Sequence, residues 1–254
     1  LSNDAILEAQ MLMLQAHNIL NPANGAPITV PAQDMVLGLY YITKLRKGAK
    51  GEGLTFYGPE EALIAYNEGK VDIHAIVNVV VKDLDKDGKI VDVMMKETSV
   101  GRVIVNEIVP AEVGYLNTII SKKSLRDIIS DVIKAVGVAR ACEFLDGIKN
   151  LGYYMAFKGG LSFNLGDIII PKEKEELVKR GNEEVEQIMM NYNMGFITDN
   201  ERYNQVIDTW THVNSDLSDI LYKTIKNDDQ GFNSVFMMLD SGARGSKEQI
   251  RQLS

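Results

Sequence analysis

Residues 198–220 read TDNERYNQVIDTWTHVNSDLSDI, and this stretch decides the most distinctive part of the fold. Thr198, with Glu201 three residues later, forms the capping box that typically begins an α-helix. Apolar residues then recur at alternating steps of three and four, as along the seam of a coiled coil: Tyr203, Val206, Trp210, Val213, Leu217 and Ile220. We therefore predict a helix that packs one apolar stripe against a partner helix.

The partner helix is expected directly upstream. Residues 172–192 are highly charged and carry apolar or small residues at helical spacing: Val178, Gly181, Val185, Ile188 and Tyr192. Only residues 193–197 separate the two helices, which favours an antiparallel hairpin with Trp210 buried near Gly181 or Val185. An amphipathic helix pair lying on a globular core would give the same pattern, but the charge of the first helix favours a projecting coiled coil.

The patterns upstream of Pro171 are mixed, and they predict short helices and strands together. Residues 34–43 are so apolar that periodicity assigns them to no element type. Helices are expected over 2–20, 58–66, 121–136 and 146–157, and strands over 28–31, 73–81 and 89–95. The predicted fold class is a multi-part α+β chain, in which a mixed domain of short strands and helices precedes an antiparallel helical hairpin.

Composition excludes several classes of protein. The net charge of the 254 residues is −8, so the chain as a whole is not a simple basic binder of phosphate backbones. Cys142 is alone and is read as a small buried hydrophobe, and the three histidines are too scattered for a zinc site. No apolar run approaches the roughly 20 residues of a membrane span, and no secretory signal opens the chain. We expect a cytoplasmic protein, and because both ends fall inside helical patterns, a piece of a longer one.

Three short motifs suggest ligands, and each has a simpler explanation. Residues 83–88 (DLDKDG) match half of an EF-hand loop, but Met94 stands where calcium needs a glutamate, and a turn between strands explains them. Residues 242–247 (GARGSK) lack the spacing of a Walker loop and the context of a KH loop. Lys158, before two glycines, belongs to either an anion-contacting loop or a plain turn.

Basic residues also recur near the end of the chain. Arg244, Lys247 and Arg251 are spaced to share one face of a helix, which would be either a solvated face or a contact with a phosphate-rich partner. No catalytic triad, nucleophile elbow or convincing carboxylate pair is present in the sequence. The residues by themselves therefore predict no reaction.

Several longer strings are specific, and together they resemble bacterial RNA polymerase β′ subunits. They occur in the family's order: NILNPANG (18–25), VPAQDMVLGLYY (30–41), TSVGR (98–102), ERYNQVIDTW (201–210) and NSVFMMLDSGARGS (233–246). One departure is Ala32, where the family usually has serine. The resemblance covers the whole chain. It implies a tail of the active-site domain (1–16), a pore domain (17–171), a funnel domain with the coiled-coil hairpin (172–232) and the first half of the bridge helix (233–254).

The resemblance also implies a role in template-directed RNA synthesis. The segment would line the secondary channel through which nucleotides reach the active centre, and would work with the β, α, ω and sigma subunits, DNA and RNA. Mg²⁺ would act in the full enzyme at an aspartate motif that this sequence lacks, so we expect no catalytic or metal-binding residue here and no activity of the chain alone. A free-standing coiled-coil interaction module without an enzymatic role is the alternative.

Site residues follow from the same resemblance. Gln33 would face the path by which nucleotides enter, Lys158 would lie in a pore loop, and Arg244 would lie close to nucleic acid, with Lys247 and Arg251 beside it. The hairpin turn is an exposed apolar tip at which secondary-channel regulatory factors would dock: Met194, Gly195, Phe196 and Ile197.

Overall fold

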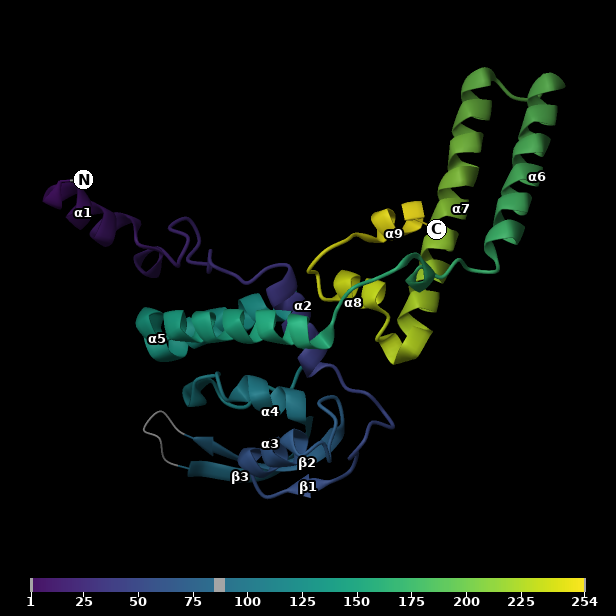
Figure 1. Cartoon of the computed structure of the whole chain (residues 1–254). Coiled ribbons are helices and arrows are strands. Elements are labelled where there is room, and N and C mark those ends of the chain that lie inside the picture. The colour runs from purple at the N-terminus through teal and green to yellow at the C-terminus, as the bar shows by residue number, and fades with distance from the viewer. Residues whose placement is uncertain (1, 85–89, 254) are drawn as a thin grey trace. The chain divides into compact units, whose positions relative to one another are not determined.

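A computed structural model of the chain describes residues 2–84 and 90–253 (Figure 1). They form two compact units: unit 1 comprises Leu1–Leu161 and Asp240–Arg244, and unit 2 comprises Ser162–Leu239 and Gly245–Ser254. The half-motif for calcium at 83–88 lies largely outside the described residues. Among the residues described, no helix is both long and apolar enough to span a membrane.

Unit 1 contains a three-stranded sheet in the order β1-β2-β3, formed by β1 (Thr55–Phe56), β2 (Ile76–Leu84) and β3 (Ile90–Ser99). β1 runs parallel to β2, and β2 pairs antiparallel with β3, from Ile76 opposite Ser99 onward. The two predicted strands are confirmed, but the third, over 28–31, is wrong. Only an isolated bridge from Leu20 to Pro27 forms near it, because Pro27 and Pro31 cannot donate to a ladder.

Unit 1 also contains α-helices, some beside the sheet and some farther from it (Figure 1). They are α1 (Asn3–Glu8), α2 (Asp34–Thr43), α3 (Pro59–Asn67), α4 (Val100–Asn106) and α5 (Lys122–Gly159). α5 includes both helices predicted between 121 and 157, and it bends at Gly137, whose φ of 78° favours glycine. The helix predicted over 2–20 is too long. α1 passes into a π-turn and a 3₁₀ turn and buries no residue, so no packing extends it.

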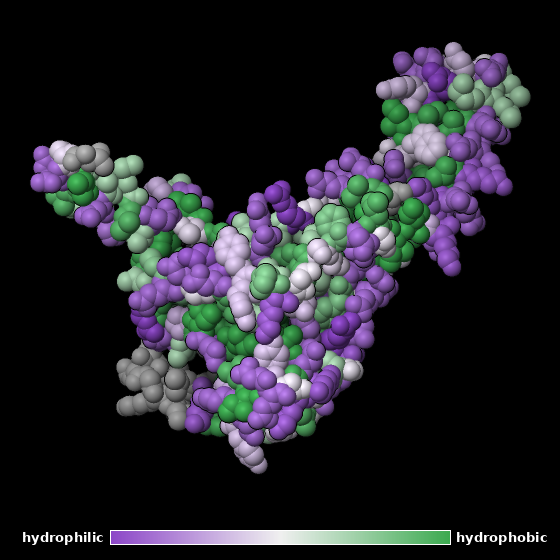
Figure 2. Space-filling model, in the orientation of Figure 1, coloured by the Kyte–Doolittle hydropathy of each residue, from purple (hydrophilic) through white to green (hydrophobic). Residues whose placement is uncertain are grey.

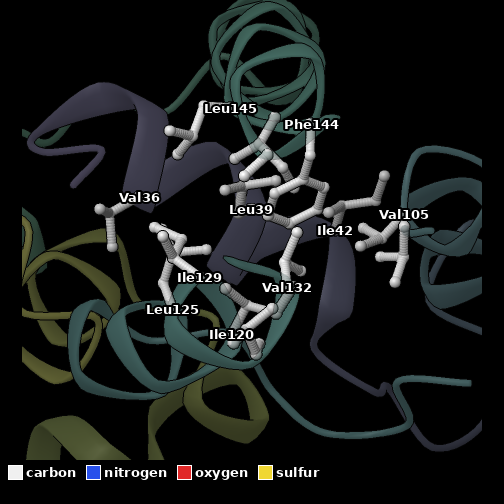
Figure 3. Close-up of a cluster of buried hydrophobic side chains, with 14 of the residues drawn as sticks. Val36, Leu39, Ile42, Val105, Ile120, Leu125, Ile129, Val132, Phe144 and Leu145 are labelled. Atoms are coloured by element: carbon white, nitrogen blue, oxygen red, sulfur yellow. The ribbon is translucent and has the colours of Figure 1, made fainter. Parts of the chain in front are cut away.

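The main core of unit 1 lies between α2 and α5. Figure 3 shows the buried side chains from α2 (Val36, Leu39, Ile42) among those from α5 (Leu125, Ile129, Val132, Phe144, Leu145). The two helix backbones nearly touch, since a Cβ built on Gly38 would lie 2.0 Å from the carbonyl oxygen of Gly152. α2 is covered on most sides, which explains why its sequence is apolar without a clear period.

Unit 2 contains the helical hairpin. α6 (Lys174–Asn193) and α7 (Asp199–Asn227) lie side by side and antiparallel, which confirms the prediction (Figure 1). Thr198 caps α7 through a full capping box with Glu201. A Cβ on Gly181 would lie 3.4 Å from the ring of Trp210, so the predicted neighbours are correct. However, Trp210 is half-buried rather than buried, because the helices pair along one narrow stripe.

The resemblance implies the first half of a bridge helix over 233–254, and the structure shows an interrupted helix there. The chain forms two short helices instead, α8 (Ser234–Asp240) and α9 (Lys247–Leu253). Gly242 and Gly245 between them have φ of 72° and 89°, values that interrupt a helix. In unit 2, α8 and α9 bury apolar side chains with those of α7: Leu221, Ile225, Val235, Phe236 and Ile250.

Candidate functional site

Gln33 occupies a strained position immediately before α2. Its φ of 52° and ψ of −123° are unusual for a residue with a side chain. The backbone carbonyl of Gln33 accepts from the Leu37 N–H at 3.0 Å, while its exposed side chain does not cap the helix. Such strain costs on the order of 1–3 kcal/mol and gathers at functional sites. The Gln33 amide is thus exposed beside the first turn of α2.

Lys158 is held in place by aromatic rings. It lies in the last turn of α5, with its Nζ 4.9 Å from the ring centre of Tyr66 and 5.8 Å from that of Tyr154. A hydrogen bond with Tyr66 raises the pKa of the Lys158 ammonium, which therefore stays charged. The side chain is nevertheless exposed. Lys158 therefore offers a fixed positive charge to an anion in solution.

The turn after Lys158 packs closely on α2. A Cβ on Gly159 would lie 2.9 Å from Cε1 of Tyr41, and Gly160 ends α5 in the left-handed conformation. Since Tyr41 is eight residues after Gln33, Gln33 and Lys158 lie at opposite ends of the contact between α2 and α5. Along α2 this is roughly 12 Å. The two residues are therefore not partners in one small site.

The predicted basic face near the end of the chain does not form as one helix face. Arg244 is exposed in the non-helical segment between α8 and α9, and it belongs to unit 1. Lys247 begins α9, with its Nζ 4.5 Å from the ring centre of Tyr222. Arg251 follows one turn later and is partly exposed. The helical spacing from Arg244 to Lys247 extends across Gly245, whose φ of 89° is not helical, so the two residues do not share a helix face.

The hairpin tip presents apolar side chains to solvent. Met194 and Phe196 are 66% and 74% exposed, Gly195 is exposed, and Ile197 is partly exposed. Figure 2 shows apolar surface among polar side chains at this end of the hairpin. The N–H of Gly195 donates to the Tyr192 carbonyl and that of Phe196 to the Asn191 carbonyl, the bonds of a Schellman turn.

The conformation of Gly195 fixes the shape of this tip. Its φ of 78° is the left-handed conformation that the turn needs. The tip is therefore a defined apolar surface rather than a loose loop.

A buried arginine went unrecognised in the sequence. Arg102 in α4 is 7% exposed, and its Nε donates to the Thr43 carbonyl at 3.0 Å. Its Nη1 donates to the backbone and side-chain oxygens of Asn117 at 3.0 and 2.9 Å. Burial lowers the pKa of the Arg102 guanidinium. The string TSVGR (98–102) therefore has a structural role in unit 1, as Ser99 also caps α4.

Within residues 2–84 and 90–253, no group of three or more His, Cys, Asp or Glu side chains could hold a metal ion. Exposed cations and an exposed amide are groups that can bind anions, and an exposed apolar tip is suited to a protein partner. These features are the candidate functional sites of the two units.

Comparison with known proteins assigns the family. The family description RNA polymerase Rpb1, domain 3, matches residues 18–168, and RNA polymerase Rpb1, domain 4, matches residues 197–254. The chain belongs to the RNA polymerase Rpb1 family. The resemblance drawn from the sequence strings is thereby confirmed.

Similar members of this family are bacterial. DNA-directed RNA polymerase subunits beta' of Bacteroides fragilis, Bacteroides thetaiotaomicron and Flavobacterium johnsoniae are 86%, 85% and 56% identical to the chain. Each alignment covers 100% of this chain and 18% of the relative. The chain thus spans about a fifth of the length of these curated relatives.

The two Rpb1 matches divide the candidate residues between them. The domain 3 match includes Gln33 and Lys158, together with the sheet and α2 to α5. The domain 4 match includes Ile197, the whole of α7 and the three basic residues from Arg244 to Arg251. α6 lies between the matches.

Proposed function

We propose that this chain is the part of an RNA polymerase β′ subunit that lines the secondary channel, and that its hairpin tip is a docking site for transcription factors. The observation that carries the proposal is the 86% identity, over all 254 residues, to the beta' subunit of Bacteroides fragilis. In this role the chain supports template-directed RNA synthesis in the cytoplasm, with the β, α, ω and sigma subunits, DNA and RNA as partners.

The geometry of unit 1 supports contact with nucleotides. A triphosphate that moves along a channel wall is attracted by fixed cations and by hydrogen-bond donors. Lys158 supplies a cation held over two rings, and Gln33 supplies an outward amide. The proposed pore domain extends from residue 17 to 171, after a tail of the active-site domain at 1–16.

Catalysis would depend on residues outside this chain. The described residues do not fit a metal ion, as they contain no suitable cluster of ligands. By the resemblance, Mg²⁺ would be held at an aspartate motif that this sequence lacks, and we propose that the chain alone would not extend RNA.

The remaining assignments concern residues 172–254. We propose that 172–232 form the funnel domain. We also propose that 233–254 correspond to the first half of the bridge helix, which in this chain consists of the two short helices α8 and α9. The alternative of a free-standing interaction module would account for the hairpin but not for the family match over 18–168.

The channel role is tested with polymerase that contains the full-length β′ subunit. Lys158→Ala should raise the KM for nucleoside triphosphates several-fold and change kcat little, because it removes a contact made before the chemical step. Lys134→Ala is the matched control, since Lys134 is an exposed lysine of the same helix. An unchanged KM in Lys158→Ala would contradict the channel role of this residue.

The docking role is tested separately. Phe196→Asp should weaken the effect of secondary-channel factors on transcription, because a charge replaces an exposed apolar contact at the tip. RNA synthesis without factors should stay unchanged. Thr211→Asp, an exposed substitution on α7, is the control. Full factor response in Phe196→Asp would exclude docking at this tip.

A further inference from the structure

Three polar groups of unit 1 form a connected chain that ends on the exposed Asp240. Tyr40 of α2 is 2% exposed, and its hydroxyl donates to Oδ2 of Asp240 at 2.7 Å. The ammonium of Lys44, itself on a residue 8% exposed, donates to the Tyr40 hydroxyl oxygen at 3.2 Å. A cation, a hydroxyl and a carboxylate are thus linked in series, which polarises and strengthens both hydrogen bonds.

Asp240 opens a segment that is anchored at further points in the same unit. The carbonyl of Ser241 accepts from the Lys122 N–H at 2.9 Å, and Ser241 is fully buried. The Ala243 N–H donates to Ser241 Oγ at 3.3 Å, and the Ala243 side chain packs against the main core. Arg244 follows directly and is exposed. The segment 240–244 is therefore a fixed loop that ends on an exposed guanidinium.

Stability alone does not explain the buried polar groups. A phenylalanine at position 40 would fill the same apolar space, and burying a lysine and a hydroxyl incurs a desolvation cost. Buried polar networks are instead suited to selecting one geometry among several. In unit 1 this network fixes the conformation of the loop 240–244, which carries Arg244.

We propose that Tyr40 is a positioning residue for Arg244. Its hydroxyl links Lys44 to Asp240, and the resulting position of the 240–244 loop directs the Arg244 guanidinium toward a nucleic-acid phosphate. This inference rests on the proposed function and on the resemblance to β′ subunits, which implies that Arg244 lies close to nucleic acid. Tyr40 itself contacts no nucleic acid in this scheme.

The test uses elongation complexes of polymerase with the full-length β′ subunit, and measures their retention against salt concentration. Loss of one phosphate contact lowers the slope of log retention against log salt by about one. Arg244→Ala should show this decrease, and Tyr40→Phe should show part of it. Tyr115→Phe is the matched control, since it removes another hydrogen-bonded tyrosine hydroxyl of unit 1, the partner of Thr98. It should leave the slope unchanged.

The double variant distinguishes positioning from general destabilisation. If Tyr40 acts through Arg244, adding Tyr40→Phe to Arg244→Ala changes the slope no further. A normal slope in Tyr40→Phe, beside a reduced slope in Arg244→Ala, would overturn the positioning role alone. A normal slope in Arg244→Ala would remove the proposed role of Arg244, and the inference with it. If Tyr40→Phe does not assemble, Asp240→Asn tests the same link from its other end.

Discussion

Replacing Gly38 with alanine should destabilise unit 1, because this is a place where two helix backbones almost touch. The added Cβ would lie 2.0 Å from the Gly152 oxygen and 2.8 Å from the Ala156 nitrogen, whereas ordinary contact begins at 3.4 Å. α2 must therefore move by about 1.4 Å from α5, which disturbs the core between them. Overpacking of this kind costs about 1–3 kcal/mol or more, while alanine gains up to about 1 kcal/mol of helix propensity. We expect a net loss of about 2 kcal/mol.

Urea unfolding measures this loss. With a slope of about 2 kcal/mol per molar urea, the midpoint of unit 1 should fall by about 1 M. Circular dichroism follows both units, and amide exchange in α2 reports unit 1 alone. Gly181→Ala is the control, since its Cβ would meet side chains at 3.1 Å or more and should change stability little. If Gly38→Ala unfolds at the wild-type midpoint, the close approach of the two backbones does not exist in solution.

Three further predictions test single side chains. Burial lowers the pKa of His74, so the folded state resists a proton that the unfolded state accepts below about pH 6.5. The stability of unit 1 should therefore fall from pH 7 to pH 5 in urea titrations, and it should fall less in His74→Gln; an equal fall in both proteins would contradict this role of His74. Arg102→Leu leaves the carbonyl oxygens of Thr43 and Asn117 without their donor and should cost about 2–4 kcal/mol in the same assay. A near-neutral effect would contradict the structural role of Arg102. Thr198→Ala removes the cap of α7 and should cost about 1 kcal/mol, seen as faster amide exchange in its first turn.

Features with local signals were predictable from the sequence. The capping box at Thr198, the short turn and the regular apolar spacing together predicted α6 and α7 and the contact of Trp210 with Gly181. The exposed apolar tip followed from the same pattern. Each helix depends on neighbours within about four residues along the chain, so its pattern is visible in the sequence. The short turn between the helices then determines which positions of α6 and α7 meet.

Features that depend on distant residues were not predictable in this way. Tyr40 and Asp240 are 200 positions apart, and Arg102 donates to the Thr43 carbonyl 59 positions away. Neither pairing produces a periodic pattern in the sequence. The strand predicted at 28–31 failed because its prolines exclude a ladder. The basic face of Arg244 and Lys247 failed because the backbone at Gly245 is not helical.

The return of residues 240–244 to unit 1 has a consequence for the timing of biosynthesis. The first backbone N–H groups of a helix have no partner within it, and the N–H of Lys122, at the start of α5, donates to the carbonyl of Ser241. A ribosome that has made residue 161 must add about 80 more before this carbonyl exists, which takes about 4–16 s at ordinary rates of synthesis. During that interval α5 begins without its final hydrogen bond and Tyr40 without its carboxylate. Unit 1 therefore completes its folding only after the hairpin has been synthesised.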